Sequence, residues 1–473
     1  MESMEQRIKD FVRQQGVEVV GIAGPDRLDG PPSLDPTYTM KGARSIVSYI
    51  LPMDVEAIDA YLGKKSYVPH NLDQFRKNIR VNAIGDLVAA YIRTLGYAAE
   101  PVKANTTYRR SLYPFSLHPS FSHRFGAMAA GIAAQGWSGN VMTEEYGAAN
   151  YIGTVVTSAV LASDRPRYGP RHFVDGWCRK CKMCDKVCAA RMFREVEEEY
   201  VLVNGELHPR ARRNDINLCN ATCFGLHAIS PDRKFTSWGF GWIRPWMKKP
   251  TDRMSKLSVI GSFLSRVFTR GDSGPRFQMI ATLGKAYVPQ EHLQAWFDRR
   301  PERLPYPERV EAFRELGEKI GVKGLRSDRL LTCGQCGLVC GPTVKESARR
   351  FSLLARSGLA VQNAQGEMVV APTYEKAEEI YTERLPGLTF WDLLRDCLAL
   401  VSLILRNYTG LEPRSFLGGI VYEARRRKAV RLRIAGHKDA RPASLPHPAI
   451  PSPRSALPPS PATRRDEAAR ASA

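Results

Sequence analysis

Cysteines are the residues of this sequence whose type and spacing most clearly predict chemistry. Four of the ten, Cys178, Cys181, Cys184 and Cys188, follow one another as C-x2-C-x2-C-x3-C. A tight loop with this spacing places three thiolates on one cubane iron-sulfur cluster and sends the fourth to a neighbouring cluster. Structural zinc sites typically use cysteine pairs separated by longer loops, so this spacing favours iron over zinc.

A second set, Cys333, Cys336 and Cys340, reads C-x2-C-x3-C and is one ligand short of a full set. Cys219 is the candidate for the missing thiolate, and Cys223 stays open as a substitute. We therefore predict two [4Fe-4S] clusters. The first takes Cys178, Cys181, Cys184 and Cys340. The second takes Cys188, Cys333, Cys336 and Cys219. Clusters that exchange ligands in this way lie close enough for rapid electron transfer, which predicts an electron-handling protein.

The start of the chain and its apolar stretches bear on location. MESMEQRIKDFVRQQG contains neither an apolar export segment nor a twin-arginine pair, so we expect a cytoplasmic protein without a disulfide framework. No uncharged apolar run reaches the ~18 residues of a membrane span. The most apolar stretch, residues 390–405, has a narrow polar face at helical spacing. It predicts a core or interface helix, with peripheral membrane contact as the alternative.

The elements that must position the cysteines are a mixture of helices and strands. Apolar positions recur at helical spacing from Ile84 to Leu95, and Gly96 marks a stop. A second helix is expected at the N-terminus, over residues 2–15. Short β-branched runs predict strands at 17–23, 43–51, 97–102 and 151–161. The segment 126–136 is rich in Gly and Ala, which lets backbone approach another group closely.

Beyond these elements lie an insertion and a tail. An aromatic-rich insertion at about 230–325 carries Trp238, Trp242, Trp246 and Trp296, which either fill a core or wall a substrate pocket. Residues 442–461 hold eight prolines, so we expect a disordered tail from about residue 437. The net charge of +21 is partly a tail effect, because residues 424–473 hold twelve Lys or Arg against three Asp or Glu. Such charge attracts nucleic acid, anionic lipid or acidic redox partners.

Six segments in this order carry a family resemblance. They are ARSIVSY, LGYAAEP, a Gly/Ala helix AAGIAAQGWSGN, EEYGAANYIGTVVTSAVL, and the two cysteine sets. Together they resemble the corrinoid and iron-sulfur superfamily of reductive dehalogenases and epoxyqueuosine reductases. The resemblance covers roughly residues 15 to 345, except the stretch from about 230 to 325.

The resemblance implies an α+β fold: a nitroreductase-like cobalamin-binding core, a ferredoxin-like two-[4Fe-4S] domain and a disordered basic tail. We place the core at 1–170, the cluster domain at 171–345, a C-terminal helical segment at 346–436 and the tail at 437–473. It also implies base-off cobalamin along the stretches that match 131–147 and 154–157. The candidate contacts there are Gly131, Gly136, Trp137, Gly139, Tyr146, Gly147, Thr154 and Thr157.

The chain departs from the family pattern in places that bear on the reaction. Relatives commonly carry Lys or Arg where Asn140 stands. The segment 103–124, where epoxyqueuosine reductases carry a catalytic aspartate, contains no acidic residue. That absence favours a tyrosine proton donor beside a basic residue, as in dehalogenases. Tyr108 with Arg109 is the first choice. Tyr113 and His123 are the alternatives.

The function predicted from these residues is reductive removal of a leaving group, such as halide, from a small organic substrate. Electrons would come from a reduced ferredoxin, a flavodoxin or a reductase. Two alternatives remain open: an epoxyqueuosine-reductase-like enzyme acting on tRNA, which the basic charge favours, and a two-cluster electron carrier without catalysis.

Overall fold

The computed structural model describes residues 2–103, 108–109, 118–167, 178–188, 192–213, 238, 295–296, 298–319, 334–362, 368–380 and 413–437. The chain divides into two compact units, residues 1–429 and 430–473. In the second unit only residues 430–437 are described, and they continue a helix of the first. The mixture of helices and strands agrees with the expected α+β class.

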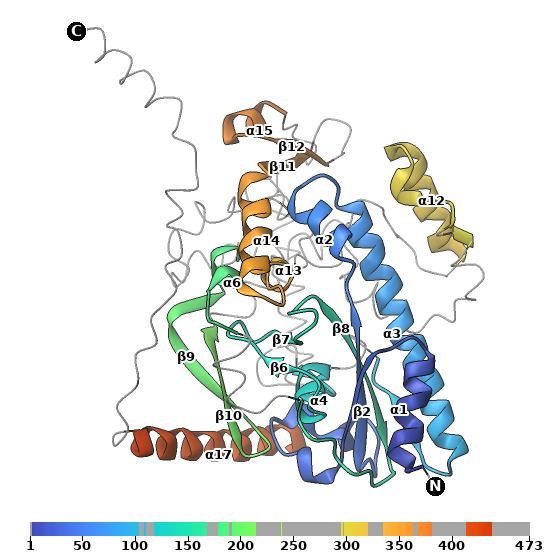
Figure 1. Ribbon diagram of the computed structural model, residues 1–473, viewed down its shortest axis with the longest axis vertical. Coiled ribbons are helices and arrows are strands. Elements are labelled where there is room, and N and C mark those ends of the chain that lie inside the picture. Colours follow the sequence, from blue (N-terminus) through green and yellow to red (C-terminus); the bar gives the residue numbers. More distant parts are fainter. Residues whose placement is uncertain are drawn as a thin grey trace, which may run out of the picture. The chain divides into compact units, whose positions relative to one another are not determined.

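A four-stranded antiparallel sheet forms the centre of the first unit (Figure 1). Its strands lie in the order β1 (Val19–Ala23), β2 (Ser45–Pro52), β8 (Asn150–Thr157) and β3 (Ala99–Pro101). Each pair of neighbours is antiparallel. All four strands overlap the ranges expected from their β-branched runs.

The two faces of this sheet pack against different helices. On one face, Val47 and Val155 pack with α1 (Met4–Gln14) and the second half of α3 (Val68–Thr94). On the other face, Ile46 and Val156 pack with α4 (His123–Ala129). Neighbouring residues of a strand point to opposite faces, so both faces are apolar and both are covered.

Two expected helices differ from the observed ones. The helix α3 begins at Val68 rather than near Ile84. Its first half packs against α2 (Val55–Leu62) instead of the sheet, and therefore does not share the apolar stripe of the second half. The Gly/Ala segment AAGIAAQGWSGN is not a helix, which corrects the expectation. The helix α4 stops at Ala129, and Gly131 has a φ of +71°, a value that ends a helix.

Two β-hairpins come after α4, and the first begins within this segment. β6 (Ala134–Gln135) pairs with β7 (Val141–Met142), and β9 (Phe193–Val203) pairs with β10 (Glu206–Arg213). The turn of the longer hairpin is Asn204-Gly205, where both residues have positive φ. This dipeptide is a strong hairpin signal that the sequence prediction did not use.

The remaining described elements are mostly short. Two one-turn helices are α6 (Met183–Lys186) and α13 (Gln335–Leu338). The other helices are α12 (Tyr306–Lys319), α14 (Val344–Arg356), α15 (Tyr374–Ile380) and α17 (Pro413–His437). The other strands are β4 (Tyr108–Arg109), β5 (His118–Pro119), β11 (Leu359–Gln362) and β12 (Met368–Ala371). The stretch 346–436, expected to be helical, thus contains a β11–β12 hairpin. The apolar stretch at 390–405 and the tail beyond 437 lie outside the described residues.

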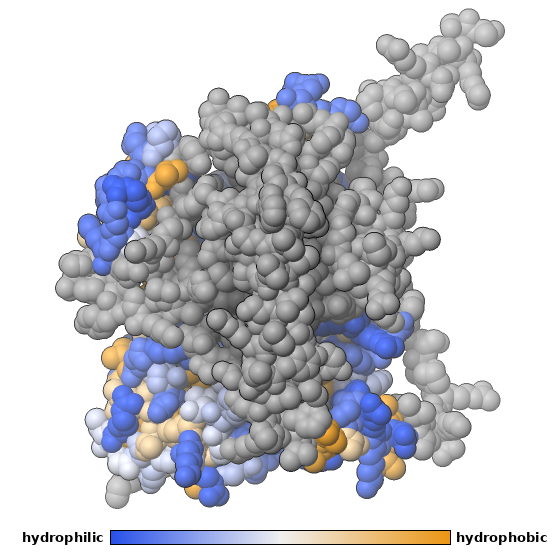
Figure 2. Space-filling model, turned by 180° about the vertical axis from the view of Figure 1, so that it is seen from behind, coloured by the Kyte–Doolittle hydropathy of each residue, from blue (hydrophilic) through white to orange (hydrophobic). Residues whose placement is uncertain are grey.

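On the face shown in Figure 2, hydrophilic and apolar areas lie side by side where the structure describes residues. None of the described helices combines the length and the apolar character that a membrane crossing needs.

A buried lysine joins α2 to α14. Lys64 is 4% exposed, and its Nζ donates hydrogen bonds to the Leu354 carbonyl oxygen at 3.1 Å and to Ser357 Oγ. Both acceptors lie at the C-terminal end of α14, where helix carbonyls favour a cation. Burial nevertheless lowers the pKa of Lys64 to about 7 from its ordinary value of 10.5.

This lysine should make stability rise with pH. Between pH ~7 and ~10.5 the unfolded chain binds more protons at Lys64 than the folded chain, so the free energy of unfolding should rise through this window, by up to about 1.4 kcal/mol per pH unit. Thermal unfolding from pH 6.5 to 9 should show this slope reduced in Lys64→Met. The control is Lys65→Met, which alters an exposed neighbour. Parallel pH profiles for wild type and Lys64→Met would contradict the assignment.

Candidate iron-sulfur site

Two short loops carry the described cysteines, and they share one backbone arrangement. Lys182 and Gly334 each precede a single helical turn, α6 or α13, and both have left-handed φ values, 59° and 56°. Cys184 and Cys336 are each the second residue of that turn. Cys188 and Cys340 each follow four residues later, so the two loops are equivalent position by position.

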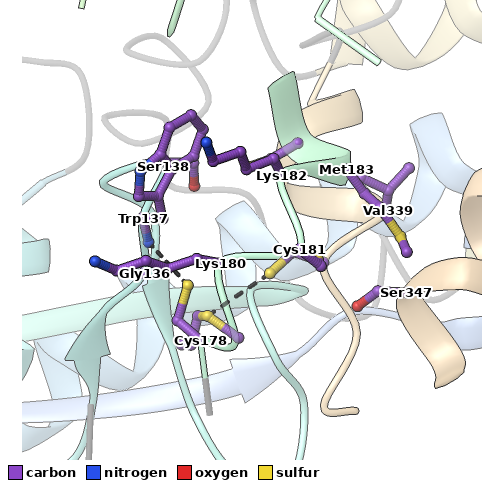
Figure 3. A pocket seen from close by; sticks show the side chains of 13 residues that line it. Gly136, Trp137, Ser138, Cys178, Lys180, Cys181, Lys182, Met183, Val339 and Ser347 are labelled. Atoms are coloured by element: carbon purple, nitrogen blue, oxygen red, sulfur yellow. Dashed lines mark hydrogen bonds between the residues drawn. The ribbon is translucent and has the colours of Figure 1, made fainter. Parts of the chain in front are cut away.

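Four cysteines from these two loops line one pocket (Figure 3). Cys178, Cys181 and Cys184 come from the first loop, and Cys340 comes from the second. They are the same four residues that the sequence analysis assigns to the first cluster. The equivalence of Cys188 and Cys340 agrees with an exchange of ligands between the loops, although the ligand roles themselves stay predictions.

Burial sets the electrostatics of this pocket. It raises the pKa of Cys184 well above its ordinary value and also raises the pKa of Cys340, and for both thiols the neighbouring cysteines add to the shift. Lys180 and Lys182 line the same pocket, and Lys182 Nζ lies 5.6 Å from the centre of the Trp137 ring. Thiols must lose their protons to bind metal, and a bound cationic centre compensates for burying the resulting charge.

The donor set fits the predicted cofactor. Four sulfur donors suit soft metal centres, and a [4Fe-4S] cluster takes four cysteine thiolates. Among the residues that the structure describes, no three His, Cys, Asp or Glu side chains are grouped so that they could hold a single metal ion. Cys219, Cys223 and Cys333 lie outside the described residues. Of the remaining second-cluster candidates, Cys188 accepts a hydrogen bond from the Met192 amide at 3.3 Å.

The four glycines that the resemblance assigns to the corrin lie against other atoms of this chain. A Cβ added to Gly131 would lie 2.6 Å from Pro166, and one added to Gly147 would lie 2.4 Å from the Cys340 carbonyl oxygen. The atoms that a Cβ on Gly136 or Gly139 would meet are Met142 Sδ at 2.8 Å and the Arg213 guanidinium at 2.5 Å. These glycines thus permit close packing within the protein.

The other residues assigned to the corrin are also engaged within the fold. Thr154 Oγ1 lies 2.9 Å from His123 Nδ1, and Thr157 Oγ1 donates to the Ala98 carbonyl oxygen at 2.9 Å. Tyr146 Oη donates to Glu18 at 3.2 Å. The ring centre of Trp137 lies 5.9 Å from that of Phe193. As arranged here, the eight residues do not form an open cradle and do not fit a flat macrocycle.

The proton-donor candidates are only partly described. Tyr108 and Arg109 form β4, which pairs with Pro119 and His118 of β5, and Tyr113 lies outside the described residues. His123 is half-buried as a whole, but its Nε2 lies in the interior without a hydrogen-bond partner. Burial lowers the pKa of His123 to about 4, so its imidazole is neutral at pH 7.

Two of the four insertion tryptophans prove to be core residues. Trp238 is 2% exposed, and its Nε1 donates to the Tyr61 carbonyl oxygen at 2.9 Å. Trp296 is 4% exposed, and its Nε1 donates to the Ala312 carbonyl oxygen at 2.8 Å. Trp242 and Trp246 lie outside the described residues. Aromatic density alone did not distinguish a core from a pocket wall.

Comparison with known proteins gives a partial match. No family model matches the chain. Residues of this chain are 26% identical, over 160 positions, to tetrachloroethene reductive dehalogenases of Desulfitobacterium hafniense and Dehalobacter restrictus. This match supports the predicted resemblance to the superfamily of reductive dehalogenases and epoxyqueuosine reductases. The aligned part is 34% of this chain and 25% of those relatives, so the chain spans about a quarter of their length in the match.

Solved structures of a reductive dehalogenase and of epoxyqueuosine reductases are similar to this chain, with low TM-scores. A catabolic reductive dehalogenase in complex with 3-bromo-4-hydroxybenzoic acid is 16% identical, with a TM-score of 0.33, over 54% of this chain and 35% of its own. Epoxyqueuosine reductase from Streptococcus thermophilus is 13% identical, with a TM-score of 0.31, over 75% of this chain and 99% of its own. The named relatives are oxidoreductases.

The shared pocket makes a specific prediction for Cys340. Anaerobic reconstitution of the wild type should yield about eight irons per chain, as expected for two cubanes. Cys340→Ala should lose about half of them, although the substitution leaves the entire first motif intact. Cys397→Ala, which removes a cysteine assigned to neither cluster, serves as the control. Full iron content in Cys340→Ala, or zinc in the wild type, would contradict the assignment.

Proposed function

We propose that this protein is an iron-sulfur reductase that removes a leaving group, such as halide, from a small organic molecule. The bond from carbon to the leaving group breaks and a carbon–hydrogen bond forms. This change consumes two electrons and one proton and releases the leaving group as an anion. A reduced ferredoxin, flavodoxin or reductase supplies the electrons, and the two clusters pass them on singly.

The observation that carries this proposal is the pocket shared by the two cysteine motifs. Sulfur atoms separated by more than 150 positions in the sequence meet there, as two clusters with exchanged ligands require. The match to tetrachloroethene reductive dehalogenases supports the leaving-group chemistry.

The resemblance implies cobalamin, but the residues assigned to it do not fit the macrocycle as arranged here, so the proposed reaction does not depend on it. The glycines and threonines named for it are engaged in internal packing and hydrogen bonds. Reconstitution with hydroxocobalamin tests this point separately, because co-elution of a base-off corrin spectrum would support the cofactor and its absence would remove it.

The proton must come from a group that holds one at neutral pH. The neutral imidazole of His123 is a poor acid there, because its pKa is about 4. A phenol keeps its proton at pH 7, since its ordinary pKa is near 10. Tyr108 therefore stays the proposed donor on the strength of its phenol alone, because consecutive residues of a strand point to opposite faces and Arg109 is the next residue of β4.

The tRNA-directed alternative lacks its acid. The segment 103–124 contains no Asp or Glu, so the aspartate that epoxyqueuosine reductases use there has no counterpart in this chain. Binding of an epoxyqueuosine-modified stem loop with turnover would reverse this preference.

Replacing the phenol should separate chemistry from electron supply. Tyr108→Phe keeps the ring and removes the acid, so leaving-group release driven by reduced methyl viologen should slow by roughly 10²-fold, while the cluster spectra stay unchanged. Tyr97→Phe, at a partly exposed tyrosine outside this segment, is the matched control. Unchanged turnover in Tyr108→Phe would move the role to Tyr113 or out of the segment.

A further inference from the structure

One hairpin contacts both cysteine loops. The 136–148 hairpin is the part of the β6–β7 hairpin that follows β6, together with the turn after β7. Its Trp137 amide donates a hydrogen bond to Cys178 Sγ at 3.1 Å. Its Asn140 side chain donates from Nδ2 to Cys336 Sγ at 3.4 Å. One donor therefore faces a cysteine of the first predicted cluster, and the other faces a cysteine of the second.

The hairpin is held against the second loop by backbone contacts as well. The Ala148 amide donates to the Cys340 carbonyl oxygen at 2.9 Å. Gly147, with a φ of +60°, approaches the backbone of Cys340 and Gly341 so closely that a Cβ would overlap it. These contacts fix the distance between Asn140 and the loop that carries Cys336.

The backbone of Asn140 is held in place. Its backbone amide donates to Ser138 Oγ at 3.3 Å, and its backbone carbonyl oxygen accepts from the Gly136 amide at 2.7 Å. An amide oxygen would repel a thiolate, so Nδ2 is the group that belongs next to sulfur. The contact is therefore a directed donor to a predicted cluster ligand.

We propose that Asn140 sets the reduction potential of the cluster bound by Cys336. This inference rests on the proposed function, because it requires both clusters. A hydrogen bond to a cysteine sulfur stabilises the more negative, reduced cluster and raises its potential. The first cluster receives its donor from the Trp137 backbone, which no side-chain substitution removes. Among the described donors to cysteines of the second cluster, the Met192 amide that bonds Cys188 is also a backbone group, so Asn140 Nδ2 is the donor that a side-chain substitution removes.

Potentiometric titration of the anaerobically reconstituted full chain tests this, with dithionite as reductant and electron paramagnetic resonance as readout. Asn140→Leu keeps the size of the side chain and removes the donor. One of the two midpoint potentials should fall by about 59 mV, which corresponds to a tenfold change in the reduction equilibrium of a one-electron couple. The other midpoint should stay. Asn140→Asp places negative charge beside the sulfur and should lower the same midpoint further.

A matched control separates the hydrogen bond from hairpin stability. Asn150 Nδ2 donates to the carbonyl oxygens of Val141 and Gly147, so Asn150→Leu perturbs the same hairpin through an amide that bonds backbone oxygens. Asn150→Leu should leave both midpoints in place. Equal shifts in Asn140→Leu and Asn150→Leu, or no shift in either, would overturn the inference.

A direct spectroscopic signature completes the test. After exchange into deuterated buffer, the reduced wild type should show deuteron couplings at both clusters, from the amides of Trp137 and Met192 and from Asn140 Nδ2, and Asn140→Leu should lose only the coupling of Asn140. Persistence of that coupling in the variant would overturn the inference. A wild type that takes up no clusters would defeat the proposed function as well. A wild type with two clusters and an Asn140→Leu variant with unshifted potentials would defeat this inference alone.

Discussion

Burial of several thiols in one pocket is the constraint on which the rest of the site depends. Buried cysteines hold their protons, and Cys184 and Cys340 show this as raised pKa values. A protein interior stabilises several adjacent thiolates only when a cationic centre is present. The two lysines at the pocket and the amides that face sulfur act in the same direction. The surrounding elements can be understood as the means of holding these sulfur atoms together.

The packing of the small residues follows from the same requirement. Gly147 lets the 136–148 hairpin lie against the backbone beside Cys340, and Gly131 ends α4 before that hairpin begins. In this structure the small residues bring protein segments together, so the hairpin and the second cysteine loop share a backbone contact. The charge on a cluster would therefore lie next to the segment that the resemblance assigns to the corrin.

Local regularity decided which features could be predicted from the sequence. The strands β2 and β8 were predictable because both are short and rich in β-branched residues, and the cysteine spacing indicated which thiols would meet in one pocket. The first half of α3 was missed because it packs against α2 and follows a different apolar stripe. The contact of Asn140 with Cys336 joins residues almost 200 positions apart, so no local pattern could reveal it. The left-handed Lys182 was equally hidden, because lysine is an unusual choice where the second loop has Gly334.

Cys340 in the pocket of Cys178, Cys181 and Cys184 also affects when the site can form. A ribosome completes the first motif long before it reaches residue 340. During that interval three thiols wait without their fourth partner, exposed to oxidation or to stray zinc. The complete set of four thiols at this pocket exists only after the second loop has been synthesised. The spacing between the two motifs in the sequence therefore sets the earliest point of synthesis at which the first cluster can have all four of its ligands.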